Sequence, residues 1–521
     1  MKRLILLFAV VILLGECTQK NSGPASPAAR TGSVQKYSLP VLTDSAAFDR
    51  MKQYFPLIDK LYKDYAEKNH FPSIAYGLVV GNQLVYSGAT GTANVKDNRP
   101  ASTKMLYRIA SMSKSFTAMA IMKLRDEGKL SLGDPVSKYI PEFSGSGALT
   151  SDAQSITILN LLTMSAGFPE DNPWGDRQLA DTDQDLLDQV KNGVSFSNVP
   201  GVTYEYSNMG FALLGKIVSN VSGMPYQQYI TRNIMQPIGM TESKWEYTEI
   251  PADVFAPGYR WEDETWKEEP VLHDGAYGAM GGLICSIEDF AKYVSLHLSA
   301  WPPRNDADNG PVRRSSLREM HQPWRVIGLF ANARTRTGTV CPIAVGYGYG
   351  LFWRQDCDGN VRISHSGGLP GYGSEWRIYP EFNMGVISFS NHTYGAPGSP
   401  NAVVLDTLIQ LAGIKKRELP PSQILEQRKE QIVSMLPDWK EEQKELFAEN
   451  FYLDSDIEHR RKQVQEVFKE AGKISRVSIL KPENQLRGTF VIECEKKNVR
   501  VFFTLTPEPG ATIQQLDIDL E

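Results

Sequence analysis

Apolar residues recur at helical spacing at the start of the first folded stretch and then change to strand-like runs. Residues 48–68 are predicted to form a helix because their apolar positions fall three or four apart: Met51, Phe55, Ile58, Leu61 and Tyr62. Residues 74–80 and 84–88 are strand-like, and the Gly81-Asn82-Gln83 segment between them is typical of a tight turn. The pattern therefore predicts a helix followed by a β-hairpin.

The middle of the chain is predicted to be helical and is followed by a second group of strands. A helix is expected to begin near Ser111 and to end at Gly128, and residues 116–122 within it are apolar on nearly every side, as in a buried helix. Residues 134–300 mix helical segments with loops rich in proline and glycine. Strand-like runs follow at 347–354, 361–365, 374–379 and 384–390. Strands at both ends imply an antiparallel sheet whose first and last parts pair, with helices inserted between them.

The composition changes near residue 415, which predicts the boundary of a second domain. Residues 415–424 contain Lys415-Lys416-Arg417 and Pro420-Pro421 and are typical of a linker. Beyond them the pattern predicts helices at 422–448 and about 457–471, and strands at 487–495, 498–505 and 511–520. We therefore expect a larger α+β domain over residues 43–414 and a separate small α+β domain over residues 425–521.

The first 17 residues are typical of a secretory signal. Met1-Lys2-Arg3 is basic, residues 4–14 are apolar but too few to span a bilayer, and Cys17 follows shortly after. The segment before Cys17 resembles the bacterial lipoprotein box, although Glu16 stands where that pattern has a small residue; a cleaved signal with an incidental cysteine is the alternative. Residues 18–42 are small and polar, as in a flexible linker. We expect export to the periplasm or cell envelope, with membrane attachment through a lipid on Cys17.

The composition indicates a globular protein and excludes several functions. The chain has 521 residues, 41% of them hydrophobic and 22% charged, and a net charge of −5. The acidic balance argues against non-specific nucleic-acid binding. The seven histidines are scattered without a metal-binding motif, so no metal site is expected. Five cysteines are too few for a disulfide framework, but Cys341 and Cys357 flank a strand-like segment and could either pair in an oxidising compartment or stay free.

Ser111-Met112-Ser113-Lys114 is the first of three motifs that could carry chemistry. Residues i and i+3 share one face of a helix, so Ser111 and Lys114 can meet. A serine hydroxyl becomes a nucleophile when a neighbouring base takes its proton, and a lysine withdrawn from water can be that base. The structural alternative is a capping serine beside an unrelated lysine. Ser478 and Lys481 repeat the spacing, but in a strand-like stretch where the helical geometry fails.

Two further motifs contain a tyrosine and a histidine. Tyr206-Ser207-Asn208 is the only Tyr-x-Asn among 22 tyrosines. A tyrosine can pass a proton to a leaving group, and an asparagine amide can orient a lysine or a substrate. His365-Ser366-Gly367-Gly368 follows a predicted strand, and the Gly368 N–H could complete an oxyanion hole with the Ser111 N–H. Taken alone, the tyrosine motif is better explained as a core tyrosine beside a turn asparagine. The alternative for His365 is a hydrogen-bonded surface histidine.

Together and in this order, the three motifs resemble those of the serine β-lactamase-like superfamily, in the branch around class C β-lactamases, D-aminopeptidases and family VIII esterases. The resemblance extends over about residues 45–412. Residues 161–167 are similar to the family segment Leu-Leu-Thr-His-Thr-Ser-Gly, with Met164 in place of the histidine. The resemblance implies a β-lactamase/transpeptidase-like α+β fold, an antiparallel sheet flanked by helices plus a helical subdomain. It does not account for residues 425–521.

The resemblance also implies a role for each motif residue. Ser111 would be the acyl-enzyme nucleophile and Lys114 its activating base. The other implied residues are Tyr206 as second proton shuttle, Asn208 as polar orienter, His365 in place of the third-motif lysine, and Gly367 and Gly368, which with Ser111 would bind the oxyanion and substrate. The resemblance implies that no cofactor is needed. We therefore expect an exported serine hydrolase that cleaves an ester or amide of a small molecule or peptide through an acyl-serine.

His365 is a departure from the family pattern. In β-lactamases and penicillin-binding proteins a lysine usually stands there, and its charge binds a substrate carboxylate. A histidine of ordinary pKa, about 6.5, is mostly neutral at pH 7, which favours other esters, amides or peptides unless a carboxylate keeps it charged. A peptidoglycan-directed D-amino-acid peptidase, a β-lactamase and a catalytically silent binding protein remain as alternatives. Cys285 lies in an apolar run and is expected to be a packed core residue.

Overall fold

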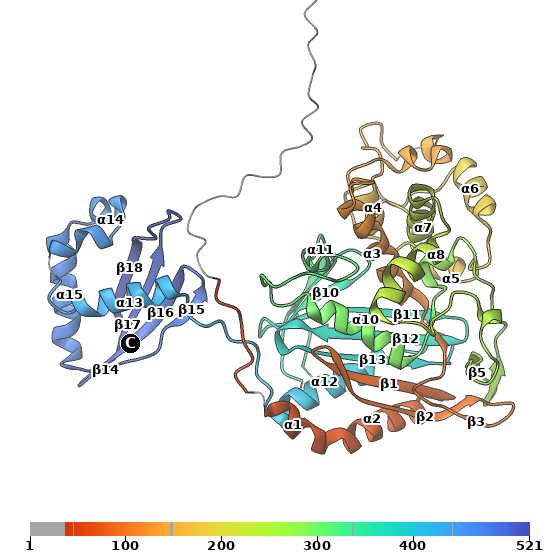
Figure 1. Ribbon diagram of the computed structural model, residues 1–521, viewed down its shortest axis with the longest axis horizontal. Coiled ribbons are helices and arrows are strands. Elements are labelled where there is room, and N and C mark those ends of the chain that lie inside the picture. The colour runs from red at the N-terminus through yellow and green to blue at the C-terminus, as the bar shows by residue number, and fades with distance from the viewer. Residues whose placement is uncertain (1–36, 45, 146–148, 336–337, 440) are drawn as a thin grey trace, which may run out of the picture. The chain divides into compact units, whose positions relative to one another are not determined.

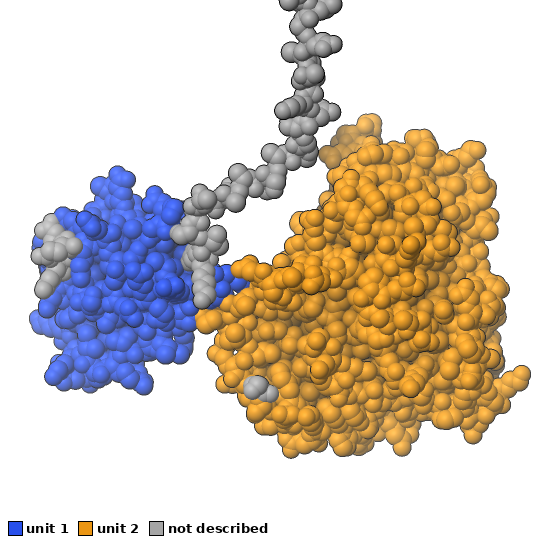
Figure 2. Space-filling view, in the orientation of Figure 1, with its two compact units in different colours: residues 1–38, 421–521 blue, residues 39–420 orange. Residues whose placement is uncertain are grey.

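The chain forms two compact units, which are coloured separately in Figure 2. The computed structural model describes residues 37–44, 46–145, 149–335, 338–439 and 441–521. Unit 2 comprises residues 39–420, and unit 1 comprises residues 421–521 together with the described residues before 39. The predicted signal, Cys17 and most of the predicted linker after it lie outside the described residues. Within the described ranges, no helix has the length and apolar character needed to cross a membrane.

Unit 2 is built on a nine-stranded antiparallel sheet with the order β3-β2-β1-β13-β12-β11-β10-β9-β8 (Figure 1). Its strands are β1 (Ser73–Val80), β2 (Gln83–Asn94), β3 (Arg99–Pro100), β8 (Arg325–Phe330), β9 (Ile343–Tyr347), β10 (Phe352–Gln355), β11 (Val361–Leu369), β12 (Tyr372–Tyr379) and β13 (Met384–Ser390). Strand β1 pairs with β13, from Ile74 opposite Ser390 to Val80 opposite Met384. The predicted pairing between the start and the end of this region is therefore confirmed.

Helices cover both faces of the sheet. One face carries α1 (Ala47–Met51), α2 (Phe55–Lys68) and α12 (Gly398–Ala412). Tyr62, Met384 and Leu405 are buried together in the core on that face. The opposite face carries α10 (Ile287–Ser299). The predicted buried helix is α3 (Ser113–Asp126), which packs on α10 through the Phe116 ring, 3.8 Å from that of Tyr293.

The predicted helical insertion lies between α3 and α10. Its helices are α4 (Ile158–Leu162), α5 (Asn172–Gly175), α6 (Asp183–Lys191), α7 (Asn208–Ser222), α8 (Tyr226–Ile230) and α9 (Gly278–Gly281). Figure 1 shows α4, α6, α7 and α8 gathered on one side of the sheet of this unit. The smaller elements of unit 2 are β4 (Tyr107–Arg108) paired with β7 (Ile284–Cys285), the hairpin β5 (Tyr259–Glu262) and β6 (Thr265–Glu268), and α11 (Arg314–Met320).

The strand predicted at 347–354 is wrong, because this segment contains the end of one strand and the start of another. Strand β9 ends at Tyr347 and β10 begins at Phe352, and the two pair as a hairpin. Gly350 has φ +68°, and a Cβ there would lie 2.9 Å from the carbonyl oxygen of Lys114. The turn thus lies close to α3 and needs glycine at this position. The aromatic residues on both sides of it, Tyr347, Tyr349, Phe352 and Trp353, concealed the break.

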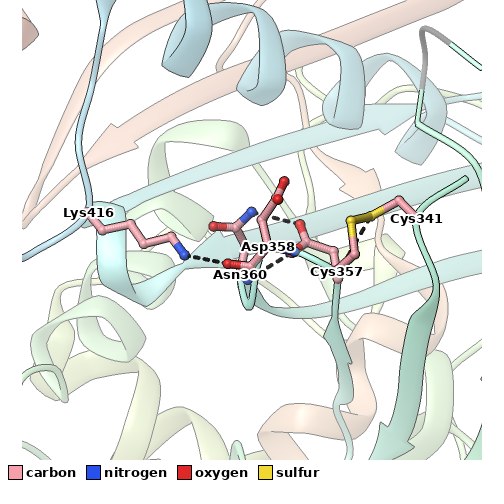
Figure 3. The surroundings of a disulfide bond; sticks show 6 residues. Cys341, Cys357, Asp358, Asn360 and Lys416 are labelled. Atoms are coloured by element: carbon pink, nitrogen blue, oxygen red, sulfur yellow. Dashed lines mark hydrogen bonds between the residues drawn. A yellow bond between two sulfur atoms is a disulfide. The ribbon is translucent and has the colours of Figure 1, made fainter. Parts of the chain in front are cut away.

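A disulfide joins Cys341, just before β9, to Cys357, in the turn after β10. The pairing that the sequence left open is therefore formed. Figure 3 shows a second contact with the same turn. The Lys416 ammonium donates a hydrogen bond to the carbonyl oxygen of Asp358, 2.9 Å away. The Asp356 side chain accepts from the backbone N–H groups of Asp358 and Asn360 and so closes the turn. These contacts fix the end of the β10–β11 hairpin.

Unit 1 is a small α+β domain with a core of its own, in which Phe490, Val501 and Phe503 are buried. Its helices are α13 (Gln423–Met435), α14 (Glu449–Asp454) and α15 (Ile457–Ala471). Its five-stranded antiparallel sheet consists of β14 (Ile474–Val477), β15 (Lys481–Asn484), β16 (Arg487–Cys494), β17 (Val499–Leu505) and β18 (Ile513–Leu520). The separate α+β domain expected from the sequence is present.

Two details of unit 1 differ from the prediction. The helix expected over 422–448 ends at Met435, because Leu436 precedes Pro437 and adopts an extended backbone. The four-residue strands β14 and β15 were not predicted, since their mostly exposed residues show no apolar alternation. Ser478 lies between these strands and Lys481 begins β15, so this second Ser-x-x-Lys lacks helical geometry, as expected.

Candidate active site

The three motifs meet at one cavity of about 350 Å³ in unit 2. Its lining residues are Ser111, Asn172, Asp176, Tyr204, Tyr206, Phe352, His365, Ser366, Gly368 and Tyr394. Four of the residues singled out from the sequence are among them. Lys114 adjoins the cavity, where its ammonium donates hydrogen bonds to Ser111 and to Asn208. The cavity therefore joins residues that lie as far as 283 positions apart in the chain, from Ser111 to Tyr394.

Ser111 lies on a short 3-10 turn, Ala110–Met112, that leads directly into α3. Ala110 has φ +52°, a left-handed backbone that costs free energy for a residue with a side chain. Two serines hold the turn in place: the Ser113 hydroxyl donates to the Ala110 carbonyl at 2.8 Å, and the Ser374 hydroxyl donates to the Ile109 carbonyl at 2.6 Å. The nucleophile candidate is thus presented by a strained turn that its neighbours stabilise.

Lys114 is fully buried and directs its ammonium at Ser111. Its Nζ lies 3.0 Å from Ser111 Oγ, 2.7 Å from Asn208 Oδ1 and 3.0 Å from the carbonyl oxygen of Met280. These three acceptors match the three protons of an ammonium group. When the lysine is neutral, its lone pair can instead receive the proton of the Ser111 hydroxyl.

The burial of Lys114 also sets its protonation. Loss of hydration lowers the pKa of the Lys114 ammonium to about 7, and the nearby Asp176 and Asp171 carboxylates limit the fall because they stabilise its charge. A lysine in water is almost wholly protonated at pH 7, whereas Lys114 is present in both forms. It is therefore suited to act as a general base near neutral pH.

Asn208 is held by the start of α7. The Ser207 side chain caps this helix by accepting from the Gly210 N–H, and the Asp171 carboxylate accepts from the backbone N–H groups of Asn208 at 2.6 Å and Met209 at 2.9 Å. The side-chain amide of Asn208 then bridges two groups, accepting from Lys114 and donating to Asn172 Oδ1 at 3.1 Å. Asn208 thus fixes the position of the ammonium.

Tyr206 lies close to both Ser111 and Lys114. Its hydroxyl is hydrogen-bonded to Ser111, and Lys114 Nζ lies 4.9 Å from the centre of its ring. Burial raises the pKa of Tyr206 well above that of a free tyrosine. Tyr206 therefore carries its proton in the resting site, ready to be donated, while Lys114 is the group that can accept one.

His365 borders the same cavity and is neutral. Burial and the neighbouring Lys114 charge lower the pKa of His365 to about 3. One ring nitrogen lies 3.1 Å from the Tyr347 hydroxyl and the other 2.6 Å from the carbonyl oxygen of Ser366. No carboxylate among the described residues contacts the ring, so the carboxylate that could have kept it charged is not there. At this position the site presents an uncharged polar group.

The two glycines that follow Ser366 have different roles. Gly368 lines the cavity with Ser111, and Gly367 faces the turn that carries the nucleophile. A Cβ on Gly367 would overlap the carbonyl oxygen of Ile109, so only glycine lets β11 approach that turn. Gly367 thus positions the site, and Gly368 is the one exposed to a ligand in the cavity.

Several residues of the site were not found from the sequence. Asp176 and Tyr394 are hydrogen-bonded to each other at the cavity, and burial raises the pKa of Asp176 to about 7, against the opposing effect of Lys114. Asn172 follows Asp171 as the first residue of α5 and supports Asn208. Isolated carboxylates, amides and tyrosines carry no spacing signal, so only the fold brings these residues to the motifs.

Met164 replaces a histidine of the family segment and takes part in the site's support. Its sulfur accepts the Ser207 N–H at 3.3 Å, and its carbonyl oxygen accepts the Glu205 N–H at 2.8 Å. The segment therefore fixes both sides of Tyr206. Cys285 is fully buried, and its pKa is raised by burial, as expected of a packed core residue and not a nucleophile. Over the described residues there is no cluster of side chains suited to a metal ion.

Comparison with known proteins places the chain in a family. Fold and site together are consistent with the family that sequence comparison identifies. The Beta-lactamase family model matches residues 58–410, and the chain belongs to that family. A protein named flp from Staphylococcus aureus (strain N315) is 29% identical over 339 residues, which are 64% of this chain and 62% of that protein.

A Dictyostelium discoideum protein named beta-lactamase-like protein 2 is 28% identical over 362 residues, 67% of this chain and 62% of its own length. The chain thus spans less than two thirds of these curated relatives. Among solved structures, an octameric penicillin-binding protein homologue from Pyrococcus abyssi has a TM-score of 0.56 at 22% identity, covering 89% of this chain and 98% of its own. A class C beta-lactamase has a TM-score of 0.53 at 20% identity, covering 70% and 97%. At these identities the likeness concerns the fold.

Proposed function

We propose that the protein is an exported serine hydrolase that cleaves an ester or amide bond through an acyl-serine intermediate. The observation that carries the proposal is the contact between Lys114 Nζ and Ser111 Oγ, 3.0 Å apart, with the Tyr206 hydroxyl bonded to the same serine. A base, a nucleophile and a proton donor thus meet at one cavity, which is the arrangement that covalent acyl transfer requires.

The protonation states give an order of events. Neutral Lys114 takes the proton of Ser111 as Oγ attacks the substrate carbonyl, and the negative charge formed on the carbonyl oxygen is stabilised by the Ser111 and Gly368 N–H groups. The Tyr206 hydroxyl donates its proton to the leaving group as the carbon–leaving-group bond breaks, and the Lys114 ammonium returns a proton to Tyr206. Water then attacks the acyl carbonyl and gives one proton to neutral Lys114; as the bond between the acyl carbon and Ser111 Oγ breaks, the Lys114 ammonium passes that proton to Oγ, which releases the acid and restores the Ser111 hydroxyl.

The neutral state of His365 affects which substrates the site is suited to bind. A site without a fixed positive charge at that position is suited to an ester or amide that does not depend on a carboxylate there. Turnover of short acyl esters alone would support an esterase. Cleavage of D-alanyl-D-alanine peptides would support a peptidoglycan-directed peptidase, and rapid deacylation after reaction with penicillin a β-lactamase. Absence of any acyl adduct would support a silent binding protein.

Export and lipid attachment belong to the same proposal. They are supported by the basic start, apolar run and Cys17 of residues 1–17, and by the Cys341–Cys357 disulfide, a bond that persists in oxidising compartments. In a bacterial host, metabolic labelling with a palmitate analogue should mark the wild-type protein and not Cys17→Ser. Recovery of the unlabelled wild-type protein with its first 17 residues intact would contradict this part of the proposal.

A fluorophosphonate probe tests the catalytic assignment. Ser111→Ala should abolish labelling because the probe reacts only with an activated serine hydroxyl. Ser366→Ala is the matched control, since this exposed serine lines the same cavity without any hydrogen bond to Lys114 among the described contacts. Ser113→Ala should also keep labelling, although its hydroxyl accepts the Leu283 N–H and the variant is expected to be less stable. Labelling that survives Ser111→Ala rejects Ser111 as the nucleophile.

A further inference from the structure

A second groove, of about 580 Å³, adjoins the catalytic cavity. Both are lined by Phe352, Ser366, Gly368 and Tyr394, so the groove opens from the cavity along the sheet. Its remote part is lined by Arg354, Arg362 and Arg377, which the proposed reaction does not use.

The register of the sheet brings these three arginines together. Arg354 of β10 is directly opposite Arg362 of β11, and Arg377 of β12 is opposite Ser364, two residues along from Arg362. Residues two apart on a strand share a face, so all three side chains leave the same face of the sheet. Like charges directly opposite each other destabilise a strand pair, so this clustering opposes folding stability.

The protein supplies one negative charge to this cluster. Glu375 is the only acid among the residues lining the groove, and it is already engaged by Arg377, 2.7 Å away, and by the Asn401 amide. Within the part of the chain that the structure describes, Nε of Arg354, Nε of Arg362 and Nη1 of Arg377 are buried without a hydrogen-bond partner. Three guanidinium groups thus retain unused donors, while one carboxylate compensates them.

The lowered pKa values of Arg354 and Arg362 indicate that their charged forms are destabilised in this arrangement. Burial, followed by repulsion from the neighbouring arginines, lowers the pKa of Arg362 to about 10, and burial lowers that of Arg354 as well. Both guanidinium groups remain charged at neutral pH. Buried charges without partners are unfavourable, whereas guanidinium donors bind carboxylate and phosphate groups strongly.

We propose that this groove binds an anionic group of the substrate, a carboxylate or phosphate, remote from the bond that is cleaved. Arg354 and Arg362 are the specificity-determining residues, and the proposal rests on the function proposed above for the adjoining cavity. Ser366 borders both spaces, and Arg362 is four residues further along β11, about 13 Å at the rise of an extended strand. The anionic group would therefore be separated from the reacting carbonyl by a chain of about 10 Å.

Matched esters test the proposal by turnover. The p-nitrophenyl monoesters of glutaric and sebacic acid each carry a terminal carboxylate, separated from the ester carbonyl by a short chain in glutarate and a long chain in sebacate. Their methyl-capped forms are neutral. The wild-type protein should prefer the charged sebacate ester over its capped form by about tenfold or more in kcat/KM, and show no such preference for glutarate. Arg354→Gln and Arg362→Gln should each reduce this ratio towards one. Arg232→Gln, an exposed arginine lining neither space, should keep it.

The ratio compares two substrates on one preparation, so a variant that is partly unfolded does not alter it. Calorimetry on Ser111→Ala gives a readout without turnover: octanoate and octyl phosphate should bind, octanol should not, and adding Arg362→Gln should abolish binding. The stronger of the two anions identifies the group. If no ester is cleaved but the anions bind, the function proposed for the cavity fails and the anion site stands. Equal rates on charged and capped sebacate esters, with no anion binding, overturn the anion site alone.

Discussion

The pH dependence of acylation follows from the burial of Lys114. Only the neutral amine can accept the Ser111 proton, so the rate of reaction with a fluorophosphonate should follow the neutral fraction. With a pKa of about 7, that fraction rises from about one tenth at pH 6 to about nine tenths at pH 8. A lysine with its ordinary pKa of 10.5 would be neutral in only about one molecule in 3,000 at pH 7.

Asp176 gives a way to shift this profile. Its carboxylate stabilises the charged form of Lys114, and the two groups titrate together, so the wild-type midpoint belongs to the pair. Asp176→Asn removes that negative charge and should move the midpoint to lower pH by about one unit, equivalent to about 1.4 kcal/mol. The variant should consequently react faster than wild type at pH 6 and equally fast at pH 8.

The assay is the pseudo-first-order labelling rate between pH 5 and 9, measured with excess probe and with circular dichroism to confirm folding at each pH. Glu170→Gln serves as the control, because this exposed carboxylate lies just before α5, whereas Asp176 follows it, and the variant should change the midpoint far less than Asp176→Asn. A wild-type rate that is flat between pH 6 and 8, or a midpoint near 10, would refute the role of burial. A midpoint that rises in Asp176→Asn would refute the assigned sign.

Three further changes have defined outcomes. Tyr206→Phe should lower kcat by about 10²–10³ with a smaller change in KM, measured with an ester, because the leaving group loses its proton donor; an unchanged kcat would exclude Tyr206. Reduction of the Cys341–Cys357 disulfide should cost about 3 kcal/mol in the free energy of unfolding, seen as a lower Tm under dithiothreitol, whereas an unaltered Tm would contradict a stabilising role. Gly367→Ala should lower both stability and labelling, because its Cβ meets the Ile109 carbonyl; normal labelling would show that this close approach is dispensable.

The sequence predicted the sheet and the motifs because both depend on local signals. The β1–β2 hairpin shows two strand-like runs around a tight turn, and the Ser-x-x-Lys spacing fits the start of a helix whose apolar residues mark it as buried. The order of the three motifs added information that no single motif carries. These features needed no knowledge of which distant segments pack together.

The features that were missed depend on tertiary contacts. The β9–β10 turn is set by the approach of Gly350 to α3, and the aromatic run around it looks like one strand. Asp176 is one of many carboxylates in the chain, and only its burial near Lys114 distinguishes it. The neutrality of His365 likewise follows from its surroundings, since the sequence could not show which charges would lie beside it.

Trapping the covalent intermediate tests the central assignment most directly. The protein is mixed with a short acyl ester, a D-amino-acid amide or penicillin, quenched in acid within the first turnover, and analysed by intact mass and peptide mapping. The account predicts a mass increase equal to the acyl group with at least one of these substrates, on the peptide containing Ser111 and absent from Ser111→Ala. An adduct on a different residue, or none with any substrate or with the fluorophosphonate, would contradict it.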